Sequence, residues 1–133
     1  MNTQPFIGLP YQDMGRDYSG VDCWGLVYLV YRDVLGITIP TYAEGCTAPF
    51  ERAQRASVVT NCITDWSRRG PGDEKVGDAV LMRMMGHLCH VGVLAPNGLI
   101  LHSEEGRNTI LEERSSANLA HRIEGFYWYD PGH

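Results

Sequence analysis

The sequence is short of basic residues and of long apolar runs, and each shortage excludes a class of protein. Lysine and arginine number 11 against 16 acidic residues, for a net charge of −5, and they form no cluster. Nucleic acids and anionic membranes are bound through a basic surface, so we expect neither as a partner. No apolar run approaches the roughly 20 residues of a membrane-spanning helix.

We expect no secretion signal, because the opening "MNTQPFIGLPYQ" has no basic region followed by an apolar one. We therefore expect the protein to be made in a cytoplasm without a signal peptide. There the four cysteines favour thiols over a disulfide framework. The 133 residues suit a single domain, residues 1–133, that buries roughly two thirds of its unfolded surface.

Helical signals come first along the chain. Asp22 is a good N-cap and Gly36 a good stop for a helix with only two charged residues between them. A helix that is apolar on nearly every face is buried. Residues 50–69 have mixed polarity and predict a second, more exposed helix that ends before a Gly-Pro-Gly sequence.

Short runs rich in β-branched and aromatic residues follow, and turn-forming residues separate them. They read AVLMRM, LCHVGVLA, LILHS, TILEER and FYWY. Helices followed by strands predict an α+β domain in which an antiparallel β-sheet packs on the buried helix. We expect FYWY to be an edge strand with Phe126 and Trp128 packed inward, and EEGRNTILEER to be the solvated face of a hairpin.

The second and third of these strands, LCHVGVLA and LILHS, bring two histidines together. The sequence PNG at 96–98 suits a three-residue hairpin loop. With side chains alternating along each strand, that loop makes His90 and His102 diagonal neighbours about 7–8 Å apart at the backbone. Gly92 leaves room between them. A two-residue turn would instead place His102 among valines, which is unfavourable for a polar ring.

Cys23 is the cysteine best placed to act as a nucleophile. The same alternation points Cys89 into the core, and we expect Cys46 and Cys62 to be structural thiols. Cys23 falls in the first turn of the helix, where the helix dipole lowers the pKa of a thiol from about 8.5. A thiolate that attacks a carbonyl needs a histidine to protonate the leaving group and a third group to orient that histidine.

A zinc site is not expected, because there is no pair of cysteines or histidines at the usual ligand spacing. The one local cluster, HLCH at 87–90, is split by the alternation of Cys89 and His90 across the strand. We therefore expect neither a metal nor a cofactor.

With Cys23, His90 and His102 in this order, the chain resembles the NlpC/P60 family of cysteine peptidases, papain-like domains that cut amide bonds in bacterial cell-wall peptides. The matching stretches are GLPYQDMGRDYSGVDCWGLV, VGDAV and HVGVLAPNGLILHS, whose order and spacing agree across most of residues 5–103. The resemblance implies a papain-like α+β fold and a peptidase that acts on peptidoglycan stem peptides.

The resemblance also implies roles for single residues. Cys23 is the expected nucleophile, His90 the general base and acid, and His102 the residue that orients His90. Tyr11 matches the family tyrosine whose hydroxyl lies near the oxyanion, and the N–H of Cys23 is a second donor there. Asp22 matches the aspartate that helps to recognise the free amino end of the substrate.

Trp24 departs from the pattern, because many cell-wall members have serine at that position. We expect Trp24 to lie with Asp22 in the substrate site and to alter the preference for a γ-D-glutamyl–diamino acid bond. The form DCWGLV and the short chain resemble members found in phage tails and gene-transfer agents. The resemblance therefore implies partners in a phage tail or tail-like particle, and a place in the virion, which delivers the peptidase to the wall.

Two other functions fit the same residues. The protein is a structural tail-tip or hub component if the site is vestigial. It is an acyltransferase or amidase if the acyl group passes to something other than water, since the sequence identifies a nucleophile and no acceptor.

Overall fold

A computed structural model of the protein describes residues 1–42, 62–84 and 86–132. The helix and strands are β1 (Arg16–Asp17), β2 (Gly20–Val21), α1 (Cys23–Val30), β3 (Trp66–Arg68), β4 (Ala79–Met84), β5 (His87–Leu94), β6 (Leu99–His102), β7 (Ile110–Glu113) and β8 (Ile123–Tyr129). Short helical turns are η1 (Tyr31–Leu35), η2 (Ile63–Asp65), η3 (Pro96–Gly98) and η4 (Ala120–Arg122). Over these ranges no helix is long and apolar enough to cross a membrane.

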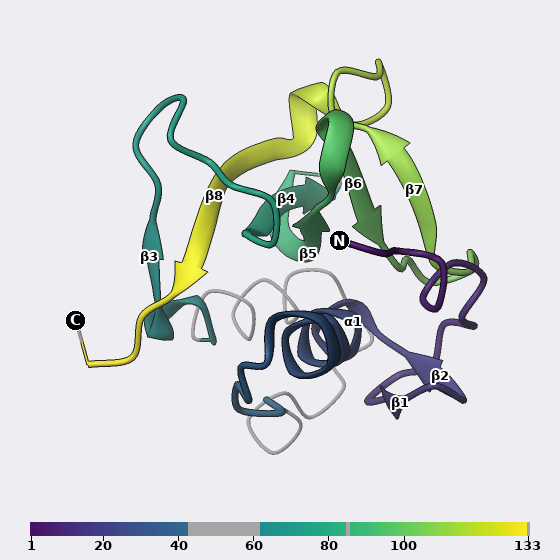
Figure 1. Ribbon diagram of the computed structural model, residues 1–133. Helices are drawn as coiled ribbons and strands as arrows, with labels where there is room; N and C mark the ends of the chain where they lie inside the picture. The colour runs from purple at the N-terminus through teal and green to yellow at the C-terminus, as the bar shows by residue number, and fades with distance from the viewer. Residues whose placement is uncertain (43–61, 85, 133) are drawn as a thin grey trace.

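The main sheet has six strands in the order β3-β8-β4-β5-β6-β7, and all neighbouring strands are antiparallel. Figure 1 shows α1 lying across one face of this sheet, with the small β1–β2 hairpin beside it. The predicted α+β arrangement of a buried helix on an antiparallel sheet is therefore confirmed.

The helix begins and ends where the sequence predicts. Asp22 is extended, with φ −91° and ψ −171°, and its side chain accepts a hydrogen bond from the N–H of Gly25, as an N-cap does. The helix continues beyond Val30 as the π-helical turn η1, and Gly36 closes it in the left-handed conformation, with φ 69°. Six of the eight α1 residues are buried, because the helix has almost no polar face to turn to solvent.

The predicted helix over residues 50–69 is wrong in its described part. Residues 43–61, with Cys46 among them, lie outside the described residues. The rest forms η2 and then β3, whose residues run from buried Trp66 to exposed Arg68 and pair with β8. Three residues are too short for their alternation to be recognised in a sequence, so only the pairing with β8 reveals the strand.

The predicted edge strand at the C-terminal end is also wrong in its position. β8 lies between β3 and β4, because β3 covers the edge that the sequence leaves open. Phe126 packs as expected, against the apolar cluster on the sheet face away from α1. Trp128 is half-buried and lies under the guanidinium of Arg69, 4.4 Å from the ring centroid.

Two apolar layers sit on opposite faces of the sheet. Leu81, Val91 and Leu101 pack with α1 on one face. The other face carries a smaller cluster that contains Val80, Met82, Leu94, Ile100 and Leu119. Full burial of a side chain of this size is worth about 1.5–3 kcal/mol relative to exposure, so these layers hold the helix and the histidine-bearing strands in fixed register.

The chain before the helix is tied to its first turn. Gly25 faces the backbone of Gly15 so closely that a Cβ atom on Gly25 would lie 1.9 Å from the Gly15 carbonyl oxygen. Tyr11 forms a parallel bridge with Val21, two residues before the helix. These contacts bring the tyrosine segment to the end of α1 that carries Cys23.

Candidate active site

The hairpin of β5 and β6 has the register that the sequence predicts. Val93 pairs with Leu101 and Leu94 with Ile100, which requires the three-residue loop at 96–98 and excludes the two-residue turn. The loop conformation differs in one respect: Asn97 is left-handed as well as Gly98, with φ values of 65° and 72°. Asparagine tolerates this conformation better than most residues.

His90 and His102 are in direct contact. Nε2 of His90 lies 3.0 Å from Nδ1 of His102, and the two residues are only 3% and 1% exposed. Gly92 makes the approach possible, because a Cβ there would lie 3.1 Å from Cβ of His102. The structure therefore brings the two predicted histidines together as a buried hydrogen-bonded pair.

A β-bulge lies next to His90. Met82 of β4 pairs with His90, and the following residue Arg83 pairs with Leu88, so Cys89 is the extra residue in β5. Bulges beside functional sites re-aim neighbouring side chains. Cys89 itself is buried, at 4% exposure, as predicted from the strand alternation.

Cys23 is partly buried and is the first residue of α1. The backbone N–H of Val91, the residue that follows His90, lies near its sulfur and favours the thiolate. Burial raises the pKa of the Cys23 thiol to about 12, with a further contribution from Asp22, while Val91 and Arg16 act in the opposite direction. The expected lowering of this pKa by the helix end is therefore wrong, because loss of water outweighs the dipole. The resting group is a thiol, which needs a base to react.

The carboxylate of Asp22 is hydrogen-bonded to other groups of the protein. Its Oδ1 accepts from Gly25 N at 2.8 Å and from Arg16 NH1 at 2.6 Å, and its Oδ2 accepts from Met14 N at 3.0 Å. Arg16 also donates to the carbonyl of Thr41. These bonds fix the start of the helix, and the substrate-binding role of Asp22 stays a prediction.

Tyr11 and Trp24 occupy different surroundings. The hydroxyl of Tyr11 donates to Asp13 Oδ1 at 2.9 Å, so it would have to leave this partner to meet an oxyanion. Trp24 is 3% exposed, and its ring packs 4.8 Å from Tyr42 and 5.9 Å from Trp66 between centroids. The predicted catalytic role of Tyr11 and the predicted substrate contact of Trp24 both stay predictions.

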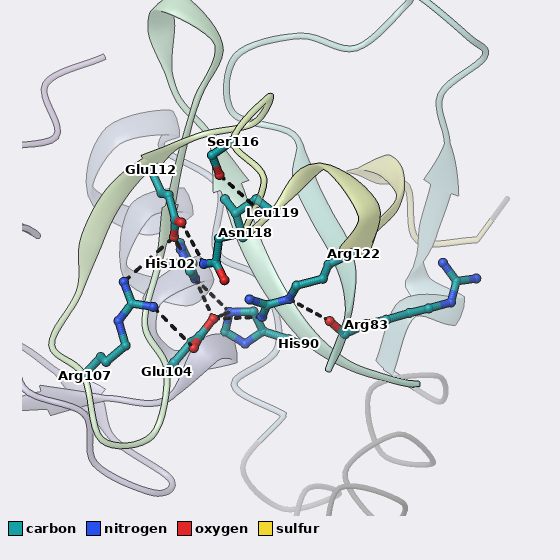
Figure 2. Close-up of polar contacts among 10 residues, drawn as sticks. All are labelled: Arg83, His90, His102, Glu104, Arg107, Glu112, Ser116, Asn118, Leu119 and Arg122. Atoms are coloured by element: carbon teal, nitrogen blue, oxygen red, sulfur yellow. Dashed lines mark hydrogen bonds and ion pairs between the residues drawn. The ribbon is translucent and has the colours of Figure 1, made fainter. Parts of the chain in front are cut away.

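Several charged residues around the histidines were missed by the sequence analysis (Figure 2). His102 Nε2 lies 3.0 Å from Oε1 of Glu112, and Glu104 Oε1 lies 3.5 Å from His102 Nδ1. Arg122 donates to the same Glu104 oxygen at 2.8 Å. The side chains of Glu104, Glu112 and Arg122 are only 10%, 17% and 13% exposed. The interpretation of residues 104–114 as a solvated hairpin face is therefore wrong for both glutamates.

The sequence contains a pattern that bears on one part of this arrangement, the position of Glu112 beside His102. Glu112 pairs across from Ile100, and His102 across from Ile110, so Glu112 and His102 share a face. The alternation of β7 would predict this if the register were known. Residues 103–109 separate the two strands, and a loop of that length specifies no register.

The electrostatics of the cluster favour a neutral His102 and an ionised Glu112. Burial lowers the pKa of His102, although Glu112 and Glu104 oppose it. Burial acts to raise the pKa of Glu112, but hydrogen bonds from Asn118 and His102 more than offset it, so that pKa lies below its usual value. The contact between His102 and Glu112 is therefore a neutral imidazole N–H donating to a carboxylate.

One set of atoms has the composition of a metal site. His90 Nε2, His102 Nδ1 and Glu104 Oε1 lie within 4.8 Å of one another. Two features make a cation unnecessary there: the nitrogens already share a hydrogen bond, and Arg122 already neutralises the Glu104 oxygen. The arrangement is complete without a metal.

Comparison of the sequence with known proteins identifies relatives of this chain. The model of the NlpC/P60 family matches residues 8–128, well past residue 103, where the recognised motifs end. Murein DD-endopeptidase MepH of Escherichia coli (strain K12) is 33% identical over 105 residues, which cover 73% of this chain and 32% of that protein. The chain thus spans about a third of the length of this curated relative.

Solved structures show the same fold. The NlpC/P60 domain of the peptidoglycan hydrolase SagA is 22% identical, with a TM-score of 0.55 over 84% of this chain and 82% of that one. An NlpC/P60 family protein from Bacillus cereus ATCC 10987 is also 22% identical, with a TM-score of 0.66 over 95% of this chain and 37% of that one.

Proposed function

Since the chain belongs to the NlpC/P60 family, we propose that it hydrolyses peptide bonds in the stem or cross-bridge peptides of peptidoglycan, with Cys23 as the nucleophile. The supporting observation is the buried hydrogen bond between His90 and His102, one residue from the backbone N–H of Val91, which lies near the Cys23 sulfur. Cysteine acyl transfer needs a nucleophile, a base and a group that orients the base.

The substrate class is drawn from the relatives. MepH is named a murein DD-endopeptidase and SagA a peptidoglycan hydrolase. Family membership supports the proposal that this chain is also a peptidoglycan hydrolase. Digestion of sacculi would identify the bond that this chain cleaves.

The reaction begins with proton transfer, because the raised pKa of Cys23 leaves a thiol at rest. His90 takes the proton as Sγ bonds to the carbonyl carbon of the amide. The N–H of Cys23 meets the oxyanion, since no helix carbonyl can accept from the first helical position. Tyr11 is the second donor once its hydroxyl turns from Asp13.

The second half of the reaction releases both products. The C–N bond breaks as His90 gives its proton to the leaving amine, and a thioester remains on Cys23. Water then attacks the thioester carbon while His90 takes a proton from it. The carboxylic acid product leaves, and the proton returns to the Cys23 sulfur.

Digestion of purified sacculi tests this function. Wild type, Cys23→Ala and the matched control Cys62→Ala, which removes a buried thiol outside the site, are incubated with walls of several chemotypes. New fragments are then identified by mass. We expect fragments from the wild type and the control only, with the masses of the two fragments from each cleaved bond adding up to the parent peptide plus one water.

Three other results would overturn the assignment. Fragments released by Cys23→Ala would show that Cys23 is not the nucleophile. An acyl group carried by an added amine would indicate an acyltransferase. No fragments from any variant would favour a structural tail component with a vestigial site.

The protein is also proposed to act from a phage tail or tail-like particle. The support is the DCWGLV form of the motif around Cys23, which resembles that of particle-borne members. Immunoblotting of particles purified from the source cells tests the proposal. A band that co-sediments with tails is expected, and its absence from tails, with the protein present in the cell lysate, would refute it.

A further inference from the structure

The ring of His102 is held at both nitrogens, and the two partners are of different kinds (Figure 2). On one side Nε2 lies 3.0 Å from a carboxylate oxygen of Glu112. On the other side Nδ1 lies 3.0 Å from Nε2 of His90. A carboxylate can only accept a hydrogen bond, whereas a neutral imidazole accepts at one nitrogen and donates at the other.

These two contacts determine where the protons lie. Because the Glu112 oxygen accepts, Nε2 of His102 must carry the hydrogen, and its Nδ1 must be a bare acceptor. His90 must therefore donate from Nε2 to Nδ1 of His102. A neutral His90 with its hydrogen on Nε2 has a bare Nδ1, which is the nitrogen able to take a proton.

A second carboxylate could reverse this order. Glu104 Oε1 lies 3.5 Å from Nδ1 of His102, and a hydrogen on Nδ1 would face it. Two observations favour Glu112 instead. Its oxygen is closer to the ring, and the oxygen of Glu104 already accepts from Arg122 at 2.8 Å. Asn118 donates to the outer oxygen of Glu112 at 2.7 Å and so holds it in place.

We propose that Glu112 is a positioning residue that sets the tautomers of both histidines and thereby presents Nδ1 of His90 as the base. The catalytic consequence rests on the proposed function, but the proton positions do not. Glu112 acts through His102 and His90 and contacts no reacting atom.

The proton positions can be read directly. In the protein with 15N-labelled histidine, the imidazole shifts of His102 separate a nitrogen that carries hydrogen from one that does not. We expect hydrogen on Nε2 in the wild type and a mixture of both tautomers in Glu112→Leu. On sacculi, kcat of Glu112→Leu should fall roughly 10- to 100-fold, as for the loss of one charge-assisted hydrogen bond, with KM nearly unchanged.

A charge-conserving rescue separates positioning from simple support of the fold. In the double variant Glu112→Gln with Asn118→Asp, the new carboxylate accepts from the glutamine amide, so the glutamine carbonyl faces His102 Nε2. The wild-type tautomer and most of kcat should return. Glu113→Gln, one residue away and exposed on β7, is the matched control and should behave as wild type.

The outcomes are distinguishable. If Glu112→Leu keeps hydrogen on Nε2 of His102, or if the double variant behaves like Glu112→Leu, the proposal is overturned. If the spectra change as expected while the wild type releases no wall fragments, the positioning role stands and the proposed hydrolase function fails.

Discussion

Asp22 raises the pKa of the neighbouring thiol while it fixes the start of the helix, so Asp22→Asn should separate these two effects. Asparagine is as good an N-cap as aspartate, and its oxygen can still accept from Gly25 N. The amide nitrogen, however, would face the N–H of Met14, and Arg16 would lose its charged partner. We therefore expect a less stable protein with a more acidic Cys23 thiol.

The magnitudes follow from the contacts. Losing the charge-assisted bond at 2.6 Å between Arg16 and Asp22 should cost roughly 1.5–3 kcal/mol, out of about 5–15 kcal/mol of total stability. Arg16 already cancels part of the field of Asp22. A remaining repulsion of about 1.4 kcal/mol would lower the pKa of Cys23 by about 1 when removed.

The assay is the alkylation rate of Cys23 against pH, with iodoacetamide and quantification of the peptide that contains Cys23. A pKa lower by about 1 gives tenfold more thiolate at pH 8, and the lower intrinsic nucleophilicity reduces this to about threefold faster alkylation. Asp17→Asn is the control, because Asp17 is exposed and, among the described residues, its carboxylate bonds only to Ser19. An unchanged or slower rate in Asp22→Asn would refute the electrostatic reasoning.

Three further predictions concern stability. Gly25→Ala places a Cβ 1.9 Å from a backbone oxygen and should lower the free energy of unfolding in urea by about 3 kcal/mol or more. Tyr31→Phe removes the buried hydroxyl that donates to Gly77 O at 2.6 Å and should cost about 1–2 kcal/mol, whereas Tyr18→Phe, at an exposed hydroxyl, should change the urea midpoint little. Burial lowers the pKa of His102 below its usual 6.5, so the neutral ring contributes stability above pH 6.5 that is lost as pH falls below it. The Tm of His102→Gln should therefore fall less between pH 7 and pH 5 than that of the wild type.

Each of these three predictions would be contradicted by a specific result. An unchanged urea midpoint for Gly25→Ala would mean that the loop before β1 does not press on the helix. Equal losses of stability in Tyr31→Phe and Tyr18→Phe would mean that burial of the hydroxyl does not affect how much its hydrogen bond contributes to stability. Parallel Tm curves for His102→Gln and wild type would mean that His102 does not take up a proton on acid unfolding.

Sequence reasoning succeeded where the decisive interactions are local. Asp22 and Gly36 mark the two ends of the helix because capping depends on neighbouring backbone groups. The loop at 96–98 determines the register of β5 and β6, and strand alternation then puts His90 and His102 on one face. These steps need no knowledge of the rest of the fold.

Sequence reasoning failed where distant segments meet. β3 is a strand because β8 pairs with it, and its three residues carry no signal of their own. Glu104 and Glu112 read as solvent-facing charges because the loop of residues 103–109 hides which side of β7 faces His102. The pKa of Cys23 was expected to fall, since the dipole of a helix end can be read from a sequence and the burial of a thiol cannot.

The amino-acid sequence by itself therefore determined the helix that carries Cys23, the hairpin that pairs the two histidines and the resemblance to a family. Only the tertiary structure decided the charges that surround those histidines and the protonation of the thiol. The physical reason is the distance along the chain between the groups that interact. Caps and turns are settled within a few residues, whereas desolvation and the choice between Glu104 and Glu112 depend on β5, β6, β7 and η4 packing together.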